Sequence, residues 1–148
     1  MSEGPIRRIL VATLGSPWSE RAFEYAVRLA KAYALELVIV AVVTPTYKPE
    51  KGAVWGLALT ANMQEEVRQH AKHVLEKASA LARAQGITYI GELREGKAAE
   101  EILKAAEQHQ CDLVIIRSRG MSGVSRVTLG ETGNEVVLKA AIPVVVVK

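Results

Sequence analysis

The chain of 148 residues has one cysteine, one aspartate and few aromatic residues. Because Cys111 has no second cysteine to pair with, a disulfide within the chain is excluded and a cytoplasmic, reducing location is expected. We interpret Cys111 as a small buried residue at the start of a strand. Asp112 is the only aspartate, whereas phosphoryl-transfer enzymes usually hold a metal near the phosphates with a carboxylate. We therefore expect no catalytic residue and no metal site, with a weak ATPase as the alternative.

Long apolar segments and the common nucleotide motifs are also absent. The run at residues 37–43 is far shorter than a membrane span, so we expect no membrane insertion. Neither a Walker phosphate loop nor Gly-x-Gly-x-x-Gly occurs, which disfavours P-loop enzymes and Rossmann dehydrogenases. His70 and His73 share a helical segment with Glu66, but they fall on its polar side. We interpret them as solvated surface residues rather than metal ligands.

The net charge of +3 is concentrated near the C-terminus. Residues 1–116 hold 14 basic and 14 acidic side chains, whereas residues 117–148 hold five basic and two acidic ones. A small anionic ligand suits this excess better than nucleic acid, because there is no long basic stripe with interleaved aromatic residues. A solvated basic loop is the alternative interpretation.

Apolar runs and helical patterns alternate along the whole chain, which predicts one α/β domain over residues 1–148. Strands are expected at about residues 6–14, 35–43, 88–93, 112–116 and 143–147. Apolar residues at helical spacing predict four main helices, the last three near 63–82, 98–108 and 132–140. Near-continuous apolar strands are typical of a mostly parallel, doubly wound sheet in a three-layer architecture. The long connection at residues 44–61 is either a lid or partner surface, or a loop folded over the sheet edge.

A glycine-bearing turn follows the fourth predicted strand, between Arg117 and Glu131. Turns between a strand and a helix bind phosphates, because backbone N–H groups and the helix N-terminus carry partial positive charge. Two positions disagree with this use: Arg117 stands where a glycine is expected, and Glu131 where a hydroxyl is expected. The sequence therefore indicates an anion site that has been altered.

The spacing Arg117-x2-Gly120-x9-Gly130-Glu131 resembles the motif Gly-x2-Gly-x9-Gly-Ser/Thr of the universal stress protein family. Residues 8–16, 95–102 and 142–147 also resemble that family's first strand, third helix and last strand. The resemblance implies the strand order 3-2-1-4-5, with ligands bound at the carboxyl ends of strands one and four. It also implies a homodimer formed through antiparallel pairing of the last strand.

The resemblance further implies which residues surround an adenine nucleotide such as ATP. Leu14 stands where nucleotide-binding members have an aspartate, and Val42 lies beside the base. The full expected set is Ala12, Thr13, Leu14, Val42, Ile116, Arg117, Arg119, Gly120, Gly130, Glu131 and Thr132. Apolar walls and two glycines are thus kept, while three polar or steric determinants are changed.

The start of the fourth helix has its own pattern. Residues 132–135, Thr-Gly-Asn-Glu, match a capping box in which Thr132 and Glu135 satisfy each other's backbone N–H groups. Glu131 adds negative charge at the positive end of the helix, although pairing with Arg117 would neutralise part of it. We expect a dimeric regulatory protein with weak or absent ATP binding and an unidentified client protein or small anion. The alternative is an ATP-binding switch with slow or no hydrolysis, in which Arg117 and Arg119 clamp the phosphates.

Overall fold

The computed structural model describes residues 4–13, 17–44, 61–120, 127–128 and 130–148. Five strands form one sheet in the order β3-β2-β1-β4-β7, and all neighbouring pairs are parallel. The strands are β1 (Arg8–Thr13), β2 (Glu36–Val43), β3 (Tyr89–Glu95), β4 (Leu113–Arg117) and β7 (Val144–Val147). With β7 as the fifth predicted strand, the expected order 3-2-1-4-5 is confirmed.

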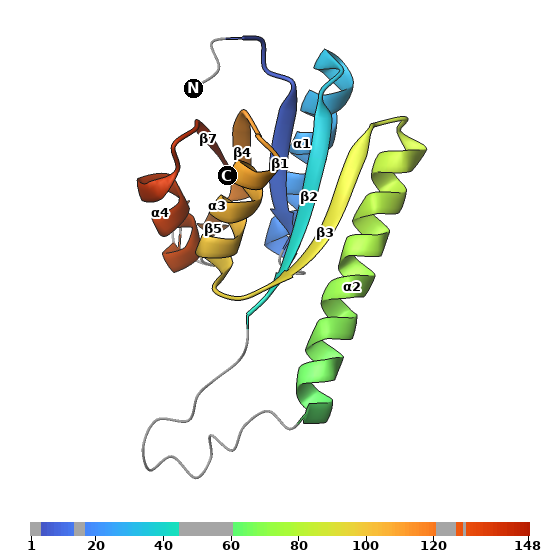
Figure 1. The fold of residues 1–148 in the computed structure, drawn as a ribbon, viewed down its shortest axis with the longest axis vertical. Coiled ribbons are helices and arrows are strands. Elements are labelled where there is room, and N and C mark those ends of the chain that lie inside the picture. The colour runs from blue at the N-terminus through green and yellow to red at the C-terminus, as the bar shows by residue number, and fades with distance from the viewer. Residues whose placement is uncertain (1–3, 14–16, 45–60, 121–126, 129) are drawn as a thin grey trace.

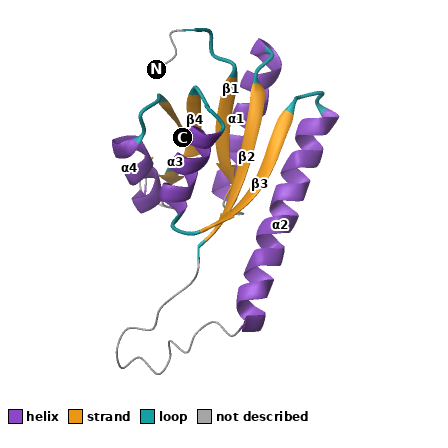
Figure 2. Ribbon diagram, viewed as in Figure 1, coloured by secondary structure: helices purple, strands orange, loops and turns teal. Residues whose placement is uncertain are grey.

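In the described residues four helices cover the sheet, and Figures 1 and 2 show their arrangement. They are α1 (Pro17–Tyr33), α2 (Ala61–Ala84), α3 (Ala98–Gln108) and α4 (Gly130–Lys139). A two-stranded sheet of β5 (Arg119–Gly120) and β6 (Val127–Thr128) lies within the stretch predicted as a glycine-bearing turn. The long connection predicted for residues 44–61 lies almost wholly outside the described residues.

The core is divided in two by the sheet, because alternate side chains of each strand point to opposite faces. On one face, Leu10, Val38 and Val114 pack with residues of α3 and α4, among them Ile102 and Val136. On the other face, the neighbouring positions Ile9, Leu37 and Ile115 pack with α1 and α2, including Phe23, Ala26 and Ala82. This division gives the three-layer architecture predicted from the sequence.

Gly96 makes the turn from β3 into α3. Its φ of +149° favours glycine, and an added Cβ would lie 2.9 Å from Cγ of Glu101. The Gly96 N–H donates to the Val43 carbonyl at 2.9 Å, which fastens the turn to the end of β2. Lys97 therefore stands directly before α3, at the carboxyl edge of the sheet.

Asp112 organises the opposite, amino edge. Its Oδ2 accepts the backbone N–H groups of Arg7 and Arg8 at 2.9 and 3.1 Å. The Arg8 guanidinium in turn donates to the His109 carbonyl and to Glu36, the latter at 3.2 Å. The only aspartate of the chain is therefore a structural residue at the edge away from the expected crevice, as predicted.

Candidate functional site

The expected crevice lies at the carboxyl edge of β1 and β4, which are neighbours in the sheet. Thr13 and Arg117 end these two parallel strands and therefore lie at the same edge. Leu14, at the expected aspartate position, lies outside the described residues, as does most of the loop between Gly120 and Gly130. The described part of the site comprises the strand ends, the backbone of β5 and β6, and the starts of α3 and α4.

The expected lining residues fall on two faces of the sheet. Ala12, Val42 and Ile116 are buried together on the α3 and α4 face, with 6%, 9% and 5% of their surfaces exposed. Thr13 and Arg117 follow Val11 and Ile115 at a spacing of two, so their side chains belong to the α1 and α2 face. The structure thus brings three apolar residues together but separates Arg117 from them.

Arg117 is held at the end of β7. Its Nη1 donates to the Val147 carbonyl at 3.0 Å, and its Nε is buried with no hydrogen-bond partner. Burial and the nearby Arg21 guanidinium both lower the pKa of Arg117. The guanidinium is thus directed to β7 and not to Glu131, the partner considered from the sequence.

Helix α4 begins earlier than predicted. Since Gly130 is its first residue, Thr132 lies inside the first turn and is not the N-cap. The predicted capping box is therefore wrong. Glu135 Oε1 instead accepts from Lys97 Nζ at 3.0 Å and lies 3.7 Å from Lys139 Nζ. The other carboxylate oxygen of Glu135, Oε2, is buried without a hydrogen-bond partner.

Negative charge gathers where a phosphate would meet α4. Glu131 is exposed in the first turn of the helix, and Glu135 follows one turn later. The hydrogen bond from Lys97 lowers the pKa of Glu135. Glu135, with Glu100 and Glu131, raises the pKa of Lys97 in return. Carboxylates thus compete for the positive end of the helix and for its nearby cation.

Lys97 is a functional candidate that the sequence reasoning missed. Its position after Gly96, at the start of α3, is a signal that could have been used, because the turn sets this residue at the carboxyl edge of the sheet. Its Nζ is the cation that the structure brings to the first turns of α4. An anion entering from this side would compete with Glu135 for Lys97.

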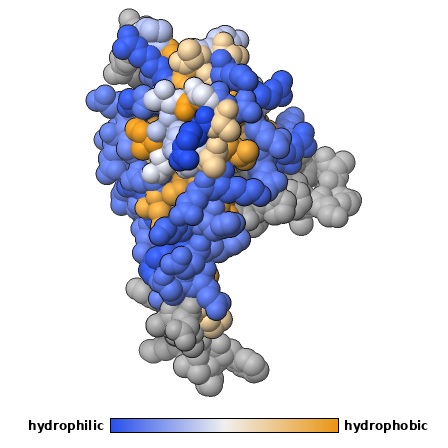
Figure 3. All heavy atoms as spheres, turned by 90° about the vertical axis from the view of Figure 1, so that its right-hand side faces the viewer, coloured by the Kyte–Doolittle hydropathy of each residue, from blue (hydrophilic) through white to orange (hydrophobic). Residues whose placement is uncertain are grey.

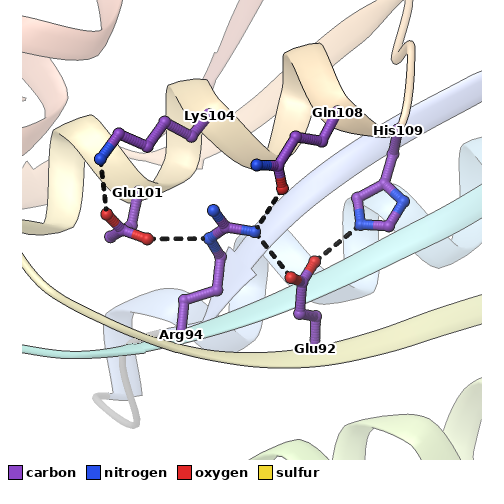
Figure 4. A network of polar contacts seen from close by, with 6 residues as sticks. All are labelled: Glu92, Arg94, Glu101, Lys104, Gln108 and His109. Atoms are coloured by element: carbon purple, nitrogen blue, oxygen red, sulfur yellow. Dashed lines mark hydrogen bonds and ion pairs between the residues drawn. The ribbon is translucent and has the colours of Figure 1, made fainter.

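A second polar cluster joins β3 to α3 (Figure 4). Arg94 donates to Glu92, Gln108 and Glu101 at 2.6, 2.9 and 3.0 Å. His109 Nε2 lies 2.7 Å from the second oxygen of Glu92. No local sequence pattern predicts this contact, because Glu92 lies on β3 and His109 lies 17 positions later, directly after α3. The cluster fastens α3 over the β3 end of the sheet.

The structure also describes the histidines of α2, the helices and Cys111, which the sequence analysis singled out. His70 and His73 are exposed on α2, and among the described residues no group of three His, Cys, Asp or Glu side chains could hold a metal. None of the helices in the described part of the chain has the length and apolar character needed to cross a membrane. Cys111 is buried, and burial raises its pKa to about 12.

A cavity of about 520 Å³ opens at the amino edge, between the ends of α1 and α2. Lys31 and Gln85 meet across it at 2.9 Å. None of the residues expected to bind nucleotide lines it. Because ligands of doubly wound sheets bind at the carboxyl edge, this cavity is not the counterpart of the expected crevice.

The sequence has clear relatives. The profile of the Universal stress protein family matches residues 5–148. A universal stress protein of Methanocaldococcus jannaschii is 30% identical over 99% of this chain and 84% of its own length. A universal stress protein of Bacillus subtilis is 31% identical over 95% of this chain and 98% of its own length.

Solved structures show the same fold. The universal stress protein of Lactobacillus plantarum has a TM-score of 0.78 at 23% identity, covering 99% of this chain and all of its own. A universal stress protein in complex with cAMP has a TM-score of 0.68 at 23% identity, covering 97% and 98% of the two chains. One from Archaeoglobus fulgidus in complex with dAMP has the same score and coverage at 19% identity. The sequence match over nearly its full length shows that this chain belongs to the universal stress protein family.

Proposed function

We propose that this chain is a regulatory binding protein, active as a homodimer, whose nucleotide crevice is altered so that ATP binds weakly or not at all. Solved relatives hold cAMP and dAMP, which supports an adenine nucleotide as the class of ligand to compare with this crevice. The observation that carries the proposal is the position of Glu131 in the first turn of α4. One turn later, Glu135 accepts a hydrogen bond from Lys97. The Glu131 carboxylate repels the phosphates that the helix N-terminus would otherwise attract, and Glu135 competes with them for Lys97.

The residues present fit one half of a nucleotide better than the other. Ala12, Val42 and Ile116 keep an apolar wall on the α3 and α4 face, which suits an adenine ring. Among the residues that the structure describes, Arg117 does not offer a donor to the phosphate half, because its guanidinium is bonded to Val147 on the other face. The crevice thus suits a small adenine compound or another weakly charged ring better than ATP.

The dimer is proposed to form through the outer edge of β7. The bonds from Val114 N to Pro143 O and from Ser118 N to Val147 O show that odd-numbered residues of β7 pair with β4. The backbone groups of Val144 and Val146 therefore point outward, where they can pair with a second copy. Helix α4, which precedes β7, leaves Leu138 76% exposed. This apolar side chain is available for burial against a partner.

A second candidate is an ATP-binding switch with slow or no hydrolysis. The unpaired Nε of Arg117 and the nearby Arg21 favour it, since two neighbouring cations at the carboxyl edge attract an anion. Binding would then require Arg117 to turn away from Val147. We rank this candidate second because Glu131 and Glu135 would remain beside the phosphates.

The nucleotide content of the purified protein tests the proposal. The protein is denatured with acid, and the released bases are separated by chromatography and quantified against protein concentration. The proposal predicts far less than one ATP per chain, also after incubation with magnesium ATP and gel filtration. ATP retained at close to one molecule per chain would overturn it and favour the switch.

A further inference from the structure

Strand β3 leaves the other edge of the sheet open. The bonds from Leu37 N to Thr88 O and from Gly96 N to Val43 O show that even-numbered residues of this segment pair with β2. Since backbone groups alternate in direction along a strand, Tyr89, Gly91, Leu93 and Glu95 direct their N–H and C=O groups outward. In the described part of the chain, the five-stranded sheet has no strand beyond β3. Such an edge accepts an added strand.

A groove runs beside this open edge, between β3 and α2. It has a volume of about 450 Å³ and is lined by Leu75, Glu76, Ser79, Arg83, Tyr89 and Gly91. At Gly91 an added Cβ would lie 2.9 Å from Ser79 Oγ, so glycine lets the helix approach the strand closely. The groove therefore has a helix as one wall and an open strand edge as the other. In this arrangement an extended peptide can pair with the strand while its alternate side chains enter the groove.

The charges of the groove limit what can enter it. Arg83 closes one end, where its guanidinium donates to the Tyr89 hydroxyl at 2.6 Å and lies 5.8 Å from the ring centre. Glu76 lies about two helical turns away and is exposed on the rim. Ser79 lies between them on α2, and Leu75, the residue before Glu76, reaches Gly91 beside Ser79. The groove thus offers a cation at the β3 start and, about two helical turns away, a leucine side chain beside Gly91 with a carboxylate next to it on the rim.

Figure 3 shows the side of the molecule that carries α2 and β3. Its surface is mostly hydrophilic, with small separate apolar patches rather than one broad apolar face. This favours backbone pairing over docking of a large apolar surface. A second copy of the chain is disfavoured, because pairing at β3 as well as at β7 would extend the assembly without closing it.

We propose that the β3 edge and its groove bind an extended peptide from a partner protein by strand addition. Three alternate side chains of the peptide face α2: an acidic one beside Arg83, an aliphatic one beside Gly91 and a basic one beside Glu76. This peptide site rests on the regulatory role proposed above. It adds to that role a surface through which the protein would bind a partner. The groove itself is separate from the nucleotide crevice and from β7.

Two seven-residue probes test the proposal, because a strand can add in either direction. They are the capped peptides Thr-Asp-Thr-Val-Thr-Lys-Thr and Thr-Lys-Thr-Val-Thr-Asp-Thr, each labelled with fluorescein and titrated with the full chain by fluorescence anisotropy. We expect saturable binding of at least one. The same peptide with every backbone nitrogen methylated should bind at least about tenfold more weakly, since strand addition depends on its N–H donors. Failure of both probes to bind, or equal affinity after methylation, would overturn the proposal.

Matched variants locate the binding. Leu93→Pro removes an outward N–H and leaves the hydrogen bonds to β2 in place. Its affinity for the probe should be about fivefold or more lower than that of Leu93→Thr. Arg83→Gln should weaken the binding of that probe. It should weaken the binding of the same peptide with asparagine in place of aspartate by a smaller factor. Circular dichroism confirms folding of each variant. Equal binding by Leu93→Pro and Leu93→Thr would place the peptide elsewhere and contradict the proposal. ATP and dimer measurements on the same samples report separately on the function proposed above.

Discussion

Arg117 Nη1 and the Val147 carbonyl lie 3.0 Å apart, which joins the end of β4 to the end of β7. The same carbonyl accepts from the backbone N–H and the Oγ of Ser118, at 2.9 and 3.0 Å. One acceptor at the end of the edge strand thus binds both Arg117, the last residue of β4, and Ser118 directly after it. Ser118 is 1% exposed, whereas the Arg117 guanidinium also faces repulsion from Arg21.

These two donors should differ in their importance for stability. Ser118→Ala is expected to lower the free energy of unfolding by about 1–2 kcal/mol, because a buried hydrogen bond is lost. Arg117→Met keeps most of the aliphatic stem and removes a poorly compensated charge, so its effect should stay within about 0.5 kcal/mol. Urea unfolding measures both. If Arg117→Met lowers the free energy of unfolding more than Ser118→Ala does, the guanidinium contributes more to stability than the Ser118 hydroxyl.

The Arg94 and Glu101 pair predicts a pH dependence. Burial raises the pKa of Glu101, but hydrogen bonds from Arg94 and Lys104 outweigh it, so the pKa is lowered from 4.5. A lowered carboxyl pKa stabilises the fold above that ordinary value and loses this effect as the pH falls through the folded value. Glu101→Gln should destabilise the protein by about 1–2 kcal/mol at pH 7.

The difference between Glu101→Gln and the unmodified protein should shrink as the pH falls below 4.5. Urea unfolding at a series of pH values from neutral downward measures it. Glu100→Gln is the matched control, because Glu100 is the exposed neighbour on α3 and lies outside the cluster. A Glu101→Gln difference that grows on acidification would show that the pair does not act as described.

Cys111 should be unreactive in the folded protein. It is 6% exposed, and burial raises its pKa to about 12, so the thiolate is scarce at neutral pH. Ellman's reagent at pH 8 should label less than one thiol per chain before unfolding and one thiol per chain in denaturant. Rapid stoichiometric labelling of the native protein would contradict the burial of this residue.

The proposed dimer predicts a specific effect of proline in β7. Val146→Pro removes an outward N–H while leaving the bonds between β7 and β4 in place. It should weaken the dimer by about tenfold or more, whereas Val146→Thr, which keeps the N–H, should not. Sedimentation equilibrium measures the dissociation constants. Should the unmodified protein be a monomer at micromolar concentration, β7 does not mediate a dimer under these conditions.

Much of the fold could be predicted because burial on both faces produces apolar runs that are visible in the sequence. The predicted third helix, 98–108, coincides with α3, and the predicted strands agree with those observed to within about two residues. The start of α4 was misplaced because Thr132 and Glu135 match a capping pattern that the structure does not use. Glu135 instead binds Lys97, which is 38 positions earlier, and no local pattern reveals such a partner.

The candidate site was predicted less completely. The carboxyl edge and the apolar residues Ala12, Val42 and Ile116 follow from strand pattern and family resemblance. The separation of Arg117 from them could also have been foreseen, because it lies at odd spacing from Ile116. The bonds of Arg117 to Val147 and of Glu92 to His109 could not, since they depend on which elements become neighbours in space.

Restoring the family pattern tests whether residues 14, 117 and 131 cause the weak ATP binding that we propose. The variant combines Leu14→Asp, Arg117→Gly and Glu131→Ser. Because Glu131 is exposed and lies near Lys97, screening should limit its repulsion of phosphate to roughly tenfold to a hundredfold in affinity. Glu131→Ser should therefore help by itself, and the three changes together should help most.

The most direct measurement is a calorimetric titration of magnesium ATP into the unmodified protein and the triple variant, at equal concentration and salt. The account predicts no saturable binding of ATP by the unmodified protein in the micromolar range, and a gain of at least about tenfold in the folded triple variant. A micromolar or tighter dissociation constant for the unmodified protein would contradict the central claim. So would a folded triple variant whose affinity for ATP equals that of the unmodified chain.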